Sequence, residues 1–99
     1  MILLAGTIRI APGKRDAALP HISAIVAASR TEPGCIDYSF SFDVNDDHLV
    51  HIFEVFRDAE AREAHRHMPH MKVWREAWPE AGIGDRRMRE YEIASAKDI

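Results

Sequence analysis

The 99-residue sequence has a single cysteine, no long apolar run and no excess of basic residues. Because Cys35 has no second cysteine to pair with, an intrachain disulfide is excluded, and we expect a cytoplasmic protein. The apolar start MILLAG is soon interrupted by Thr7 and Arg9, so it resembles a strand more than a signal peptide, and no segment is long enough to span a bilayer. The net charge of −3 provides no basic surface for nucleic acid or an anionic membrane, and we expect neither as a partner.

The remaining composition, 46% hydrophobic and 29% charged, is that of an ordinary globular protein. A chain of this length can form one hydrophobic core but not two, so we expect a single domain over residues 1–99. Any functional site must therefore lie within this domain or between two copies of it.

Hydrophobic periodicity predicts four strands and two helical regions. The predicted strands span residues 2–10, 35–42, 48–56 and 86–94. One helix is predicted from Lys14 to about Arg30, and a second begins after Asp58 as N-cap and restarts at Pro69, followed by a loop over residues 79–85. The order is that of a ferredoxin-like βαββαβ fold of the α+β class, with an antiparallel sheet and its helices on one face.

The predicted strands also indicate how the protein associates. Tyr38, Phe40 and Phe42 lie on one face of their strand, and Ile52 and Phe56 share a face of the next strand. We interpret these two sets as apolar surface on both sides of the sheet, of which helices can cover only one. A homodimer in which two sheets pack against each other is therefore expected.

Residues 32–74 resemble the antibiotic biosynthesis monooxygenase family of the dimeric α+β barrel superfamily. The resemblance lies in EPGC before an aromatic strand, the strand end EVF, and the helix EAHR followed by a Pro-His turn. It implies a cofactor-independent monooxygenase that oxidises a small aromatic quinol or phenol with O2, without metal or flavin. Such chemistry needs a base, a dry pocket and hydrogen-bond donors for the substrate anion.

The resemblance and the residue pattern together indicate a catalytic pair. His65 matches the histidine of the E-A-H motif and lies on the apolar stripe of its predicted helix, so it is the expected base. Glu54 shares a strand face with apolar neighbours and is expected to orient His65. The alternative interpretation is structural, in which the two residues form a satisfied buried pair.

Five further residues are predicted to bind the substrate: Tyr38, Ile52, Phe56, His70 and Trp74. Trp74 is expected to form a flat wall, and Tyr38 to donate a hydrogen bond, although core or dimer packing explains both side chains as well. His70 matches the histidine of the family's Pro-His turn. Phe56 stands where family members commonly have Trp, and Ile52 where some oxygenases of the family have Asn, so two N–H donors are missing here.

Residues 65–70, HRHMPH, contain three histidines, but their spacing lacks the pair separated by four residues that helical zinc sites use. We therefore expect no metal site, with His67 on the solvated face and the three histidines acting separately. Arg86, Arg87 and Arg89 are predicted to be exposed charges on an edge strand. Two other functions remain open: a non-catalytic dimeric ligand-binding domain, and a haem-binding or haem-degrading protein with a free imidazole as ligand.

Overall fold

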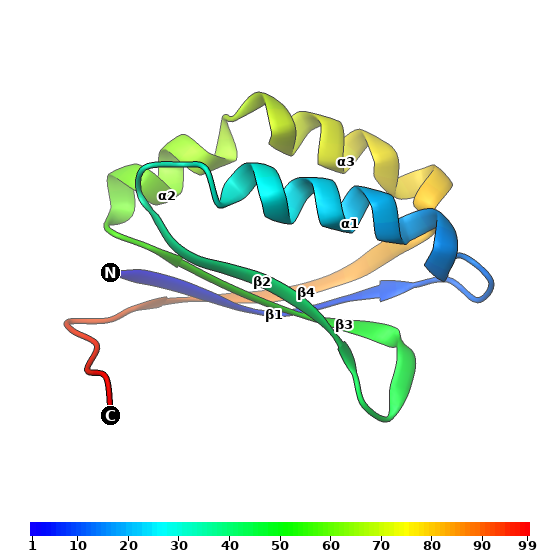
Figure 1. Ribbon diagram of the computed structural model, residues 1–99, viewed down its shortest axis with the longest axis horizontal. Helices are drawn as coiled ribbons and strands as arrows, with labels where there is room; N and C mark the ends of the chain where they lie inside the picture. Colours follow the sequence, from blue (N-terminus) through cyan, green and yellow to red (C-terminus); the bar gives the residue numbers. More distant parts are fainter.

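The computed structural model describes residues 1–99 as one antiparallel sheet with helices on a single face (Figure 1). The strands are β1 (Ile2–Ile10), β2 (Cys35–Asp43), β3 (Asp46–Phe56) and β4 (Ile83–Glu92). The helices are α1 (Arg15–Ser29), α2 (Ala59–Arg66) and α3 (Pro69–Ala81). The strand order is β2-β3-β1-β4, which confirms the predicted ferredoxin-like α+β fold.

The central strand β1 anchors the core. Its helix-facing side chains Ile2, Leu4, Ile8 and Ile10 are all buried, as their alternation predicts. Gly6 belongs to the same face, and a Cβ atom there would overlap the backbone and side chain of Met88 on β4. The absence of a side chain at this position therefore lets β4 pass close to β1 beneath the helices.

The break between α2 and α3 has a local cause. Asp58 Oδ1 accepts a hydrogen bond from the backbone N–H of Ala61 at 2.8 Å, which caps α2, and Pro69 begins α3 at its first position. Both features were predicted. The expected loop over residues 79–85 is much shorter, because α3 continues to Ala81 and Gly82 (φ 67°) ends it immediately before β4.

The predicted distribution of apolar side chains over the two faces of the sheet is wrong. In the antiparallel register, Tyr38 lies opposite Glu54 and Phe40 opposite Ile52. Directly paired residues point to the same side, so both sets face the helices. The uncovered face carries a different apolar group, which consists of Leu3, Ala5, Phe53 and Tyr91.

No helix of the protein is long and apolar enough to cross a membrane. The longest, α1, has 15 residues and packs its buried positions Ala18, Ile22 and Ile25 against the sheet and α3. Pro20 lies inside this helix.

Candidate functional site

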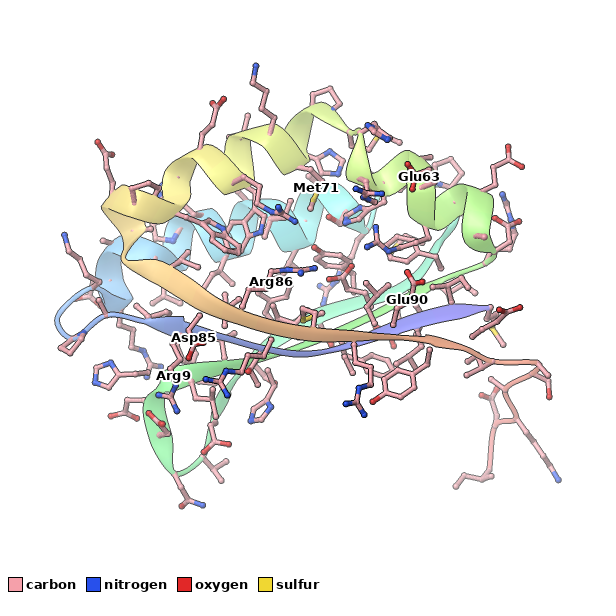
Figure 2. All side chains as sticks on the ribbon, turned by 180° about the vertical axis from the view of Figure 1, so that it is seen from behind. Arg9, Glu63, Met71, Asp85, Arg86 and Glu90 are labelled. Atoms are coloured by element: carbon pink, nitrogen blue, oxygen red, sulfur yellow. The ribbon has the colours of Figure 1, made fainter.

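A cavity of about 620 Å³ lies between the sheet and helices α2 and α3. Figure 2 shows Met71 projecting into this region from α3 and Arg86 rising toward the helices from β4. One wall is aromatic and consists of Tyr38, Phe40, Trp74 and Trp78. The polar side chains that line the cavity include Glu54, Arg62, His65 and Arg86.

The aromatic wall is continuous. Phe40 stacks on Tyr38 with ring centroids 5.6 Å apart and meets the edge of Trp74 at 5.7 Å. Trp74 in turn contacts Trp78 at 5.7 Å, again edge to face. These distances are typical of favourable aromatic pairs, so the wall is a fixed apolar surface of the kind that planar ligands prefer.

His65 is held by a carboxylate that sequence reasoning missed. Glu32, in the turn after α1, accepts from His65 Nδ1 at 2.8 Å and from His70 Nε2 at 2.6 Å, both through its Oε2 atom. His65 is 1% exposed and Glu32 is 8% exposed. The structure therefore joins two histidines that were predicted to act separately, and Glu32 rather than Glu54 forms the hydrogen bond that orients His65.

This contact fixes the tautomer of His65. A carboxylate can only accept hydrogen bonds, so Nδ1 carries the proton that is donated to Glu32. The opposite nitrogen, Nε2, is buried without a hydrogen-bond partner, and the side chain lines the cavity. Glu54 Oε1 lies 3.7 Å from Nε2. A proton acceptor and a second acid–base group thus lie side by side at the cavity.

Burial sets the protonation of this pair. It raises the pKa of Glu54 to about 7, a shift that Arg62 and Arg86 oppose but do not cancel. Burial also lowers the pKa of His65 below its ordinary value, against the opposing effect of Glu32. Near neutral pH the imidazole is therefore neutral, and Glu54 is the group that titrates.

Three nitrogen or oxygen ligand atoms, from Glu32, His65 and His70, lie within 4.8 Å of one another. This is the place where the chain could hold a divalent cation, although both ring nitrogens facing Glu32 already donate hydrogen bonds. The spacing of the histidines could not indicate this cluster, because Glu32 lies 33 residues before His65.

The remaining predicted site residues divide into two groups. Tyr38, Ile52 and Trp74 line the cavity. Phe56 and His70 do not line it. Phe56 is fully buried and packs against His65 with ring centroids 4.8 Å apart, and His70 contacts Glu32. His67 is on the solvated face, where it contacts Glu63 at 2.9 Å, as predicted.

The prediction for the last strand is confirmed, because β4 is an edge strand and Arg86, Arg87 and Arg89 are all exposed. Arg86 also lines the cavity together with Met88 and rises toward the helices (Figure 2), which was not predicted. The alternation of RRMRE already places Arg86 and Met88 on one face and Arg87 on the other. Arg62 was also missed, although its spacing could have indicated it. It lies three residues before His65 and hence on the same face of α2.

Comparison with known proteins places the chain in a family. The model of the antibiotic biosynthesis monooxygenase domain matches residues 1–77. The chain belongs to the antibiotic biosynthesis monooxygenase family. An uncharacterized protein of Synechocystis sp. is 31% identical over 98 residues, which cover 99% of this chain and 67% of that protein.

Solved structures agree with this family assignment. A protein of Pseudomonas aeruginosa is 33% identical, with 94% of each chain covered and a TM-score of 0.83. A Deinococcus radiodurans protein named after the same family has a TM-score of 0.90 over 100% of this chain and 98% of its own, at 23% identity. The latter similarity shows a shared fold, and a shared fold does not fix a reaction.

Proposed function

We propose that this member of the antibiotic biosynthesis monooxygenase family oxidises an aromatic quinol or phenol with O2, without a cofactor. The observation that carries the proposal is the buried Nε2 of His65, which has no partner and lies 3.7 Å from Glu54 Oε1 at an aromatic-walled cavity. Such a pair can remove a phenolic proton, because both side chains are buried beside each other.

In this proposal His65 and Glu54 act as one base. The phenolic proton passes to the pair and resides on Glu54, the more basic partner, while Glu32 keeps Nδ1 of His65 protonated. The phenolate then passes an electron to O2, and the resulting radicals combine at a ring carbon. One oxygen atom enters a C–H bond of the quinol, and the other leaves as water with the two hydroxyl hydrogens. All electrons come from the substrate, so no external reductant is needed.

Trp74 and its aromatic neighbours provide the surface against which the ring lies. Tyr38 cannot serve as the base, because burial raises the pKa of its hydroxyl far above neutral. It remains a hydrogen-bond donor beside the ring. The two donors lost at Ile52 and Phe56 are replaced in this proposal by the guanidinium of Arg62, whose Nε is buried at the cavity without a hydrogen-bond partner.

We also propose that the protein is a homodimer through the uncovered face of the sheet. That face exposes Phe53 (39%) and Tyr91 (43%) beside Leu3 and Ala5, and the strand pairing makes them neighbours. An apolar patch across adjacent strands is typical of an interface, and a second copy of the same face is complementary to it.

Oxygen uptake with a panel of quinols and phenols, in the presence of a chelator, tests the catalytic proposal. We expect kcat/KM to rise with pH through a midpoint near 7, because Glu54 must be deprotonated to accept the proton. Glu54→Gln should lower the rate at least about tenfold and abolish this midpoint. His51→Ala, which removes an exposed histidine that does not line the cavity, should change neither.

Labelled O2 should introduce one labelled oxygen atom into the product. Thermal melting of each variant separates lost chemistry from lost folding. Uptake no faster than the uncatalysed rate across the panel would refute the oxygenase and favour a ligand-binding domain of the same fold.

A further inference from the structure

The cavity has a charge opposite to that of the chain. The sequence has a net charge of −3, yet the basic side chains around the cavity outnumber its one carboxylate, Glu54. These basic residues are Arg62, Arg66, Lys72, Arg75 and Arg86. An acidic protein that gathers arginines around its main cavity has concentrated positive potential where a ligand would bind.

Three of these cations already have partners outside the cavity. Arg62 lies 3.3 Å from Glu90, Arg66 lies 3.1 Å from Glu63, and Lys72 lies 3.9 Å from Glu76. Arg75 and Arg86 have no carboxylate within 4.0 Å, and the guanidinium of Arg75 lies 5.5 Å from the ring centre of Trp78. Two arginines are therefore free to bind an anion.

Neutralising Glu54 does not explain these arginines. No arginine lies within ion-pair distance of Glu54, whose near contact is His65. Burial still raises the pKa of Glu54 to about 7, so the arginines do not hold it as an ion pair. The pKa of Arg86 is lowered by burial and by the charge of Arg75, and the opposing charge of Glu54 does not cancel this effect.

Further polar atoms at the same cavity also lack partners. The indole Nε1 of Trp78 and the imidazole Nε2 of His65 are buried and make no hydrogen bond, and His65 is 1% exposed. Buried polar groups are normally satisfied, so unpaired ones on the wall of a cavity indicate a ligand that supplies the missing contacts. Trp78 also follows Arg75 by three residues, on the same face of α3.

We infer that the cavity binds an aromatic carboxylate, whose ring lies against Trp74 and Trp78 and whose carboxylate is held by Arg75 and Arg86. The guanidinium groups suit a carboxylate because they can donate paired, charge-assisted hydrogen bonds. The inference deepens the proposed function, on which it rests only for the hydroxyl that faces His65 and Glu54.

Binding of a hydroxylated aromatic acid, measured without O2 so that it cannot turn over, tests the inference directly. The probe is 1-hydroxy-2-naphthoate, compared with its methyl ester, and the signal is the fluorescence of the chain's two tryptophans, both of which line the cavity. We expect the acid to bind at least about tenfold more tightly than the ester, since a hydrogen bond to a charged group has about this effect on affinity.

Arg86→Gln and Arg75→Gln should each weaken binding of the acid about tenfold and leave binding of the ester unchanged. Arg87→Gln is the matched control, because Arg87 lies next to Arg86 on β4 and contacts Asp85 at 3.1 Å. Equal affinity for acid and ester, equal weakening of both by Arg86→Gln, or no saturable binding of the acid would overturn the inference.

The two proposals fail separately. A charge preference without oxygen uptake would refute the oxygenase and keep the aromatic-acid site. Oxygen uptake from neutral quinols, with no preference for the acid, would keep the oxygenase and refute the role of the arginines.

Discussion

Glu32 is the residue on which the candidate base depends. Its Oε2 atom accepts from His65 Nδ1 and His70 Nε2, so one carboxylate determines which nitrogen of His65 is free toward the cavity. In the sequence, Glu32 stands in an EPG turn, where an acidic residue is unremarkable. Only its burial beside the histidines distinguishes it from the exposed carboxylates of the chain.

Glu32→Gln should destabilise the protein by about 2 kcal/mol or more, because the neutral amide weakens two charge-assisted hydrogen bonds and adds a buried NH2 donor. Urea denaturation measures this loss. Glu63→Gln removes an exposed carboxylate that also contacts a histidine and an arginine, and its effect should stay within about 0.5 kcal/mol. Equal effects of the two substitutions would show that Glu32 does not organise the site.

At the scale of elements, the interruption at Pro69 shapes the cavity. It ends α2 shortly after His65 and starts α3, which carries Trp74 and Trp78, so the base and the aromatic wall come from separate helices. In a continuous helix, the directions of His65 and of the two tryptophans relative to each other would be fixed by the helix geometry. Local signals at Asp58 and Pro69 were sufficient to predict this break, because capping and the missing proline N–H act within one turn.

Asp58→Ala should lower the free energy of unfolding by about 1 kcal/mol, since it removes the side-chain acceptor that caps α2. Urea denaturation again gives the value. Asp47→Ala is the comparison, because Asp47 is exposed and its ion-pair contact is with Arg15 at 3.8 Å. A loss at Asp58 no larger than that at Asp47 would show that the cap does not stabilise α2.

At the scale of the whole molecule, the helices cover one face of the sheet and leave the other uncovered (Figure 1). The sequence analysis predicted a dimer from the wrong side chains: Tyr38 and Phe40 belong to the cavity, whereas Phe53 and Tyr91 lie on the open face. The proposed dimer therefore buries a surface separate from the aromatic wall of the site.

Phe53→Lys should convert the dimer into monomers, because a charge at the centre of an apolar interface is costly to desolvate. Sedimentation velocity measures the outcome. Val44→Lys makes the same kind of change at a position that is 94% exposed in the turn between β2 and β3, and should leave the dimer intact. A wild-type protein that sediments as a monomer at high concentration would contradict the proposed assembly.

The sequence by itself determined the order of elements, the cap at Asp58, the break at Pro69 and the burial of His65 and Glu54, because each depends on periodicity or on contacts within a few residues. The tertiary structure alone decided the strand register, which turned Tyr38 and Phe40 toward the helices. It also brought Glu32 to His65, and Arg86 to Arg62 and Arg75. These contacts depend on how segments far apart in the sequence pack against one another, and the spacing of residues along the chain does not indicate which of them come close together.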